Sequence, residues 1–163
     1  MPKVSVIVPV YNAENFLKDS IERILSQTLT DIEIVFVDDG STDNSLKILR
    51  EIKDERVKVL TQKNINAGAA RNRGLELATG EYLSFLDADD LFDKEMLEKA
   101  YESAKATDAQ IILFGADNYN QVEDKFEPID GGITDSDNIF LKMKGWTWDK
   151  LFKTSFIKKN IDK

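Results

Sequence analysis

Three carboxylates stand directly behind a run of β-forming residues. The run covers residues 82–86 (YLSFL), and Asp87, Asp89 and Asp90 follow it. Like charges this close repel one another, and a divalent cation bound by their oxygen atoms would relieve the repulsion. Hard oxygen ligands of this kind suit Mg²⁺ or Mn²⁺. An Asp-x-Asp pair alone is also common in solvated loops and helix caps, so the motif needs support from the rest of the chain.

A second β-forming run ends in the same way. Residues 35–37 (VFV) lead directly into Asp38 and Asp39. In open α/β sheets, ligands bind outside the carboxyl ends of the strands. Two acidic strand ends at one edge of a sheet therefore predict a site for a metal ion and a polar ligand.

Strand and helix patterns alternate along the chain, which is typical of a parallel sheet with right-handed crossovers. Strands are expected at residues 4–10, 32–37, 57–60, 82–86 and 109–114. Helices are expected at residues 16–25, 46–52, 69–78 and 93–107. Asn12 is available near the start of the first helix, and Ser41 or Thr42 is expected to cap the second. The predicted fold is α/β, with a mostly parallel sheet and helices on both faces.

The composition of the chain excludes several kinds of functional site and one class of partner. The 163 residues are enough for one domain with a sizeable core. The chain has no cysteine and no histidine, which excludes disulfides, thiolate metal sites and imidazole catalysis. The net charge of −8 argues against a nucleic-acid partner, because a duplex would require a basic face.

Positive charge gathers in residues 142–163, where seven lysines accompany two aspartates and four aromatic residues. This interleaving is typical of peripheral contact with anionic lipid at a membrane surface. The alternative, which we prefer, is a packed helix with a solvated basic face.

Several nucleotide-binding folds share this outline, and the motifs distinguish them. No Gly-x-Gly-x-x-Gly follows the first expected strand, which argues against a dinucleotide-binding Rossmann fold. The chain also has no P-loop motif, which argues against a P-loop fold. Instead, four other segments occur in order. They are residues 6–12 (VIVPVYN), 37–43 (VDDGSTD), 64–74 (NINAGAARNRG) and 85–90 (FLDADD). This series resembles the GT-A-type glycosyltransferases of family two, a large bacterial group of inverting enzymes that use nucleotide sugars.

The resemblance covers residues 3–118 and implies a GT-A (Rossmann-like) fold. Residues 1–118 would form a nucleotide-sugar-binding subdomain, and residues 119–163 a partial acceptor-binding half. The implied reaction is of the hexosyltransferase type. It moves a sugar from a nucleotide diphosphate sugar (a UDP-sugar is expected) to an acceptor hydroxyl, with inversion. The implied acceptor is a carbohydrate or a lipid-linked molecule, in polysaccharide or glycoconjugate synthesis. The expected location is the cytoplasm, with the inner face of the membrane as an alternative.

Several residues suit a nucleotide diphosphate on chemical grounds. Tyr11 can stack on or border a base, with Pro9 shaping the turn. Asp39 can accept a hydrogen bond from a ring N–H or a ribose hydroxyl, as its family counterpart does with uracil. Arg71 lies early in an expected helix, where a guanidinium suits an anion or a polar ligand edge.

These residues also have structural interpretations. Asp38 and Asp39 could form a capping turn, a role that we expect in part for Asp38, while Asp39 faces the ligand. Arg71 could form a salt bridge to Asp38 or Asp87, and such a bridge is compatible with a binding role.

The resemblance also assigns the acidic cluster. It implies that Asp89 ligates the cation directly, while Asp87 contacts ribose or a metal-bound water. Asp90 has helix capping as its alternative role. The cation would stabilise charge on the departing nucleoside diphosphate.

Attack by an acceptor hydroxyl requires a general base. In the family a carboxylate serves, often in a Glu-Asp pair shortly after a segment that residues 148–153 (WDKLFK) resemble. No such pair follows this segment, so we expect a fragment that binds donor and transfers sugar poorly. Asp117, at the end of the fifth expected strand, and Asp149 are the stand-in candidates for the base.

Two functions from other classes stay open. One is a nucleotide-sugar-binding module without turnover. The other is a phosphate-handling α/β hydrolase, but that class places its Asp-x-Asp motif after the first strand, and here the motif follows the fourth.

Overall fold

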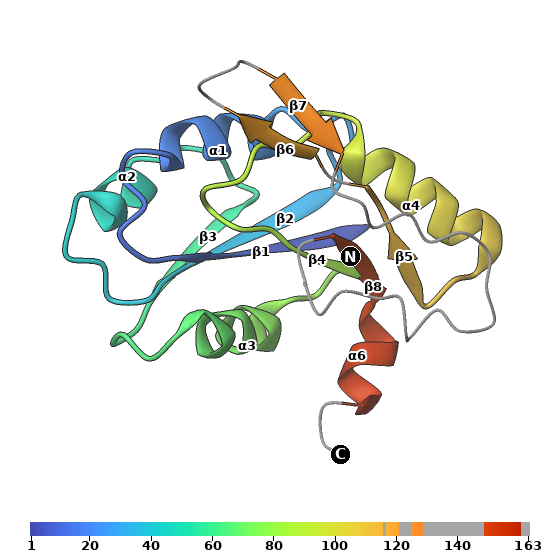
Figure 1. The fold of residues 1–163 in the computed structure, drawn as a ribbon. Helices are drawn as coiled ribbons and strands as arrows, with labels where there is room; N and C mark the ends of the chain where they lie inside the picture. The colour runs from blue at the N-terminus through green and yellow to red at the C-terminus, as the bar shows by residue number, and fades with distance from the viewer. Residues whose placement is uncertain (116, 121–124, 129–148, 161–163) are drawn as a thin grey trace.

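A six-stranded sheet forms the centre of the computed structural model (Figure 1), which describes residues 1–115, 117–120, 125–128 and 149–160. The strands of this sheet are β1 (Val4–Val10), β2 (Ile32–Asp38), β3 (Val57–Thr61), β4 (Tyr82–Phe85), β5 (Ile111–Leu113) and β8 (Lys150–Lys153). Their order across the sheet is β3-β2-β1-β4-β8-β5. The β1, β2, β3 and β4 strands pair in parallel, whereas β8 is antiparallel to both β4 and β5. The predicted α/β fold with a mostly parallel sheet is confirmed.

The register brings the carboxyl ends of the parallel strands to one edge. Val10 of β1 lies opposite Asp38 of β2, which in turn lies opposite Thr61 of β3. The β4 strand ends opposite Ile7, three residues before the end of β1. There the Leu86 amide donates to the Ile7 carbonyl oxygen over 3.0 Å. The residues that follow β1, β2 and β4 therefore emerge at the same edge of the sheet.

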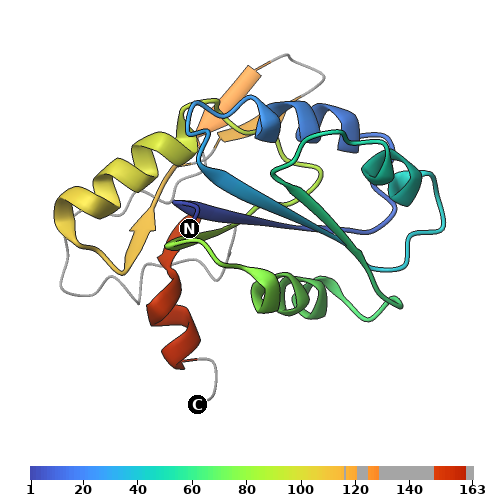
Figure 2. The ribbon, with the colours of Figure 1, turned by 180° about the vertical axis from the view of Figure 1, so that it is seen from behind.

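Helices cover both faces of the sheet (Figures 1 and 2). One face carries α1 (Leu17–Leu25), α2 (Ser45–Arg50) and α4 (Met96–Thr107), and the other carries α3 (Ala67–Leu77) and α6 (Thr154–Asn160). No helix in the described ranges has both the length and the apolar character that a membrane crossing requires.

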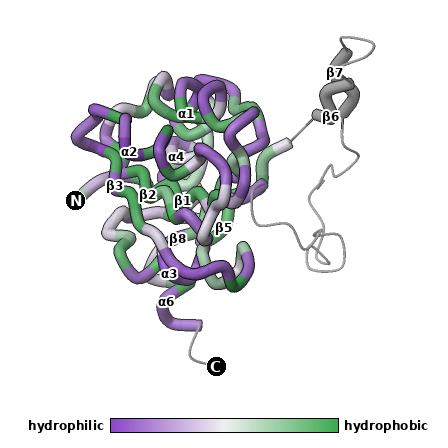
Figure 3. The backbone as a smooth tube through the Cα atoms, turned by 90° about the vertical axis from the view of Figure 1, so that its left-hand side faces the viewer, coloured by the Kyte–Doolittle hydropathy of each residue, from purple (hydrophilic) through white to green (hydrophobic). Residues whose placement is uncertain are grey.

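The strands supply the core because their side chains are apolar on both faces, as buried parallel strands require. Figure 3 shows β1 and β2 as hydrophobic segments at the centre of the molecule. Ile7 of β1 packs with Leu75 of α3 on one face, while its neighbours Val6 and Val8 pack on the face of α1. A Cβ atom on Gly74 would lie 2.4 Å from Ile7 Cγ2, so glycine permits α3 to lie directly on β1.

Two expectations for the C-terminal part need correction. Residues 150–153 form a strand and not part of a basic helix, because Leu151 is fully buried between neighbouring strands and Lys150 is only 2% exposed. The helix α6 begins only at Thr154. The polar stretch after residue 117 contains a two-stranded antiparallel pair, β6 (Asp117–Asn120) with β7 (Lys125–Pro128), where no regular structure was expected.

A buried carboxylate joins three segments at the opposite edge of the sheet. Glu33 is 6% exposed; its Oε1 accepts from Ser5 Oγ (2.5 Å) and the Thr79 amide (2.6 Å), and its Oε2 accepts from Lys58 Nζ (2.8 Å). The amide of Gly80 also donates to Oε1 over 3.1 Å. Burial alone raises the pKa of Glu33, but the hydrogen bonds from Lys58, Ser5 and Thr79 outweigh it and lower the pKa from 4.5 to about 2. Glu33 thereby holds the connection between α3 and β4 against β1 and β2.

Candidate functional site

Tyr11 and Asp39 follow neighbouring strands at the predicted edge. The Asp39 amide donates to the carbonyl oxygen of Val10 over 2.8 Å, which continues the pairing of β1 and β2 by one residue. The Tyr11 side chain is half exposed (51%), whereas Asp39 is only 3% exposed. Pro9 lies within β1 opposite Val37. An exposed aromatic ring and a buried carboxylate therefore follow paired residues at the ends of β1 and β2.

Two residues after β3 hold the Asp39 carboxylate, and neither was predicted to belong to the site. Asp39 Oδ1 accepts from Gln62 Nε2 (2.7 Å) and from the amide of Ile65 (3.0 Å). The Ile65 side chain is 63% exposed. Applying the strand-end argument to β3, which ends opposite Asp38, would have pointed to this loop.

Asp38 has the structural role expected for it. It is 1% exposed, and its two oxygens accept from the Ser41 amide (3.3 Å) and from Thr61 Oγ1 (3.4 Å). The turn between Asp38 and Ser41 requires Gly40, whose φ is +72° and whose added Cβ would lie 2.8 Å from the Asn64 amide nitrogen. Asp38 therefore stabilises the turn.

The expected helix caps are wrong. The N-cap positions of α1 and α2 are Phe16 and Asn44, and neither side chain makes a cap hydrogen bond. Instead, Asn12 (φ 49°) joins the loops after β1 and β2: its Oδ1 accepts from the Thr42 amide (2.8 Å), and its amide donates to Ser41 Oγ (3.1 Å). These long-range hydrogen bonds hold the loop that carries Tyr11 against the turn that follows β2.

Arg71 reaches the acidic strand end. Its Nη2 lies 2.5 Å from Asp87 Oδ1, and both side chains are partly exposed. This is the salt bridge that was anticipated as compatible with binding, and it selects Asp87 over Asp38. The Arg71 Nε atom is buried without a hydrogen-bond partner among the described residues. Asn66 caps α3 by accepting from the Ala69 amide (2.8 Å), so Arg71 lies close to the helix N-terminus.

The three carboxylates after β4 differ in environment. Asp89 is exposed, Asp87 and Asp90 are partly buried, and the Asp90 amide donates to the Asp87 carbonyl oxygen over 3.2 Å. Burial, together with the negative charges of Asp89 and Asp87, raises the pKa of Asp90 to about 6. Asp90 does not cap the next helix, which begins at Met96. The capping interpretation of Asp90 is therefore wrong.

The acidic turn fits a divalent cation that a ligand helps to bind. Within the described ranges, no group of three or more acidic, His or Cys side chains is arranged to hold a metal ion. Asp87 and Asp89 can offer two carboxylates from one turn. Mg²⁺ is commonly bound by one or two carboxylates together with substrate phosphates, so this donor set suits a cation completed by a diphosphate.

The two candidate bases have different placements. Asp117 begins β6 opposite Pro128 and does not end β5, which stops at Leu113; its side chain lies outside the described residues. Asp149 immediately precedes β8, whose antiparallel register with β4 brings it to the edge that carries Asp87. The Asp149 carboxylate forms an ion pair with Lys150, and its carbonyl oxygen accepts from the Phe114 amide over 3.1 Å.

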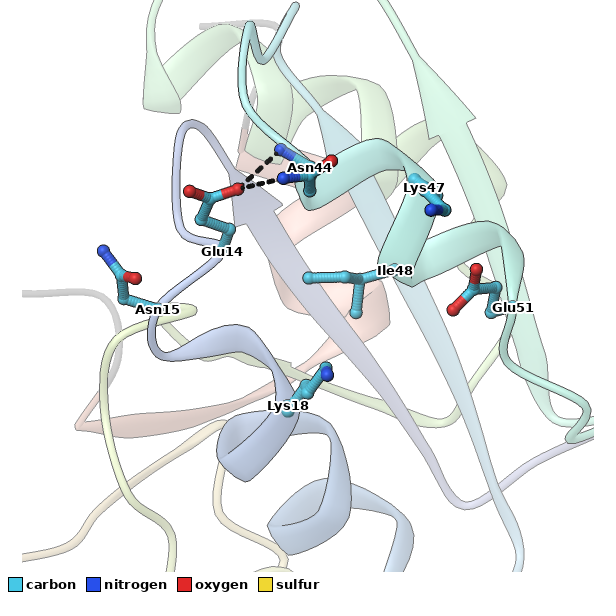
Figure 4. Close-up of a pocket in the computed structure, with 7 residues that line it drawn as sticks. All are labelled: Glu14, Asn15, Lys18, Asn44, Lys47, Ile48 and Glu51. Carbon is cyan, nitrogen blue, oxygen red and sulfur yellow. Dashed lines mark hydrogen bonds between the residues drawn. The ribbon is translucent and has the colours of Figure 1, made fainter.

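A pocket of about 540 Å³ lies between the start of α1 and α2 (Figure 4). Its lining residues are Glu14, Asn15, Lys18, Asn44, Lys47, Ile48 and Glu51. Glu14 Oε2 accepts two hydrogen bonds of 2.8 Å from Asn44 at one side of it. None of the predicted site residues lines this pocket, so it is separate from the strand-end site.

Comparison with known sequences gives a consistent result. The family described as glycosyl transferase family 2 matches residues 5–161. Glycosyltransferase GlyG of Streptococcus pneumoniae is 40% identical over 126 residues, which are 76% of this chain and 42% of GlyG. Glycosyltransferase GlyA of the same organism is 34% identical over 169 residues, 93% of this chain and 24% of GlyA. The chain thus spans less than half the length of these relatives.

Solved structures share the fold. The structure of residues 1–349 of Staphylococcus aureus TarS in complex with UDP-GlcNAc matches with a TM-score of 0.79 and 27% identity, over 97% of this chain and 47% of that one. The mannosyltransferase PcManGT of Pyrobaculum calidifontis, in complex with GDP-Man and Mn²⁺, matches with a TM-score of 0.73 over 97% of this chain and 46% of its own. At 19% identity, the second likeness concerns the fold alone.

Proposed function

The chain belongs to glycosyl transferase family 2, and on that premise we propose that it binds a UDP-sugar at the strand-end edge for transfer of the sugar to an acceptor hydroxyl with inversion. The observation that carries the proposal is the convergence of Asp39 with the Arg71–Asp87 pair at the carboxyl ends of β2 and β4. The bound UDP-GlcNAc of TarS supports the choice of a uridine nucleotide.

The base and ribose would lie against the end of β1 and the loop after β3. Tyr11 offers its exposed ring to the base, and Asp39 offers a buried carboxylate that accepts hydrogen bonds and cannot donate them. The imide N–H of uracil is a donor that suits this carboxylate. Pro9, the last residue but one of β1, is proposed to shape the turn that carries Tyr11.

The diphosphate would lie between α3 and the acidic turn. Asp87 and Asp89 would hold Mg²⁺ or Mn²⁺, which when bound supplies electrostatic stabilisation of the leaving diphosphate. Arg71 orients Asp87 through their salt bridge and places a positive charge next to the phosphates.

The acceptor side stays a prediction. The proposed acceptor is a carbohydrate or lipid-linked hydroxyl, in polysaccharide or glycoconjugate synthesis, and Asp117 and Asp149 stay the candidates for the base. Residues 1–118 are proposed as the donor-binding part and 119–163 as acceptor-side. A cytoplasmic location and a membrane contact of the basic segment are also predictions; Lys153 and Lys158 make internal contacts with Asp108 and the Ala78 carbonyl oxygen.

One observation favours donor binding without turnover as a second candidate function. The Asp149 carboxylate already forms an ion pair with Lys150, so this candidate base is engaged by a neighbouring side chain. Release of free sugar or transfer to an acceptor would exclude this candidate, and tight UDP-sugar binding without either would support it.

Binding of UDP is expected to depend on a divalent cation. Titration calorimetry with Mn²⁺ should give at least about tenfold higher affinity than with a chelator, or roughly 1.4 kcal/mol. Asp89→Asn should remove most of this difference, while Asp19→Asn, an exposed aspartate on α1, should leave it unchanged. Equal affinity with the chelator would contradict the metal site.

Asp39→Asn and Arg71→Ala are each expected to weaken UDP binding by roughly 1–3 kcal/mol, because each removes a polar contact to the ligand. Arg73→Ala is the matched control for Arg71, since Arg73 pairs with Glu76 on the exposed side of α3. Melting curves should accompany the titrations. An Asp39→Asn variant that binds normally but melts far lower would make Asp39 a structural residue only.

A further inference from the structure

We infer that Gln62 is a positioning residue for nucleobase recognition, which holds the Asp39 carboxylate so that Oδ2 faces the base. The inference rests on the proposed function, because it assigns how the UDP site sets its acceptor. Gln62 touches Asp39 and acts through it.

The hydrogen bonds to Asp39 are unequal between its two oxygens. Within the described part of the chain, both are accepted by Oδ1, from Gln62 Nε2 at 2.7 Å and from the Ile65 amide at 3.0 Å. A side-chain donor and a backbone donor on the same oxygen together restrict the rotation of the carboxylate. Asp39 is 3% exposed, so a carboxylate free to rotate would lose this orientation and leave both donors without their acceptor. The fixed orientation reserves Oδ2 for a ligand N–H.

Gln62 is itself held at both ends. Its backbone amide donates to the carbonyl oxygen of Asp38, the last residue of β2, over 2.9 Å, which extends the pairing of β2 and β3 by one residue past the end of β3. The loop after β3 lies tightly against the turn after Asp39: a Cβ atom added to Gly40 would lie only 2.8 Å from the Asn64 amide nitrogen. The side-chain amide of Gln62 therefore meets Asp39 from a fixed backbone position.

The chemistry of the amide suits this role. A primary amide donates a hydrogen bond to a carboxylate oxygen without placing a further charge next to it. Gln62→Leu would remove one donor and release the carboxylate. Gln62→Glu would set a second carboxylate against Asp39, where like charges repel. Both changes should act on recognition of the base and leave recognition of the phosphates intact.

The test compares UDP with inorganic pyrophosphate, a ligand without a base, by calorimetry in Mn²⁺. Gln62→Leu should weaken UDP binding about tenfold and leave the pyrophosphate affinity unchanged. Gln62→Glu should weaken UDP binding more. The matched control is Gln110→Leu, since the Gln110 side chain is exposed in the turn before β5. Melting curves should show that all variants fold.

A double-variant cycle separates this inference from the proposed function. On an Asp39→Asn background, Gln62→Leu should have little further effect on UDP binding, because it acts through Asp39. Additive losses, or equal losses for UDP and pyrophosphate, would overturn the positioning role. If the unmodified protein binds UDP and Asp39→Asn weakens it while Gln62→Leu does not, only the role of Gln62 fails. If the unmodified protein does not bind UDP, both proposals fail.

Discussion

Replacement of Glu33 by alanine is expected to lower the free energy of unfolding by about 3–5 kcal/mol. The side chain is almost fully buried, and its loss would leave the Ser5 hydroxyl and the amides of Thr79 and Gly80 without their common acceptor. Unsatisfied buried donors carry their full desolvation cost. Urea denaturation at pH 7 measures the change. Glu22→Ala, on the exposed face of α1, is the control and should change stability by about 0.5 kcal/mol or less.

The same carboxylate makes stability depend on pH in a defined window. The folded-state pKa of Glu33 is about 2, below its ordinary value of 4.5. Its contribution, about 3 kcal/mol, is therefore complete above pH 4.5 and is lost as the pH falls towards 2. The stability difference between the unmodified protein and Glu33→Gln should shrink over that range. A difference that stays constant from pH 7 to pH 2.5 would contradict the assigned pKa.

Leu86→Ala is expected to cost about 2–5 kcal/mol of stability. Leu86 is fully buried in the main core and directly precedes Asp87, while its amide extends the pairing of β4 with β1. Truncation opens a cavity next to the acidic turn, so UDP affinity should fall together with the melting temperature.

Leu91→Ala provides a matched control on the other side of the same turn. Leu91 is 49% exposed, so its truncation removes similar apolar atoms from solvent-facing positions and should change stability by no more than about 0.5 kcal/mol. Thermal unfolding of both variants compares them directly. Equal destabilisation by the two substitutions would mean that the burial of Leu86 does not support the turn.

The parallel part of the fold could be predicted because its signals are local. The strand β1 was predicted with its observed bounds, since an uninterrupted β-branched run such as Val4 to Val10 is typical of a strand buried on both faces. The strand β8 could not be predicted, because four residues with two lysines carry no such pattern. Its position depends on pairing with β4 and β5, which are distant in sequence.

The residues of the site also differ in how far local sequence could predict them. The Arg71–Asp87 pair was anticipated as one of two alternatives, because Asp87 follows a predicted strand and Arg71 lies early in a predicted helix. Gln62 was missed, since its role depends on a side-chain rotamer and on the register between β2 and β3. The caps at Ser41 and Thr42 were wrong because Asn12, a residue remote in sequence, competes for the same loop.

The position of β8 has a consequence for how the chain folds. Among the described strands, β5 pairs only with β8, and β8 lies between β5 and β4. The six-stranded sheet therefore cannot be completed until residues 150–153 have been synthesised. Until then β4 is an open edge with unpaired backbone groups, which can recruit another chain. Closure over such a sequence separation is slow and raises contact order. We therefore expect a late folding phase, with aggregation of nascent chains that stall before Lys150.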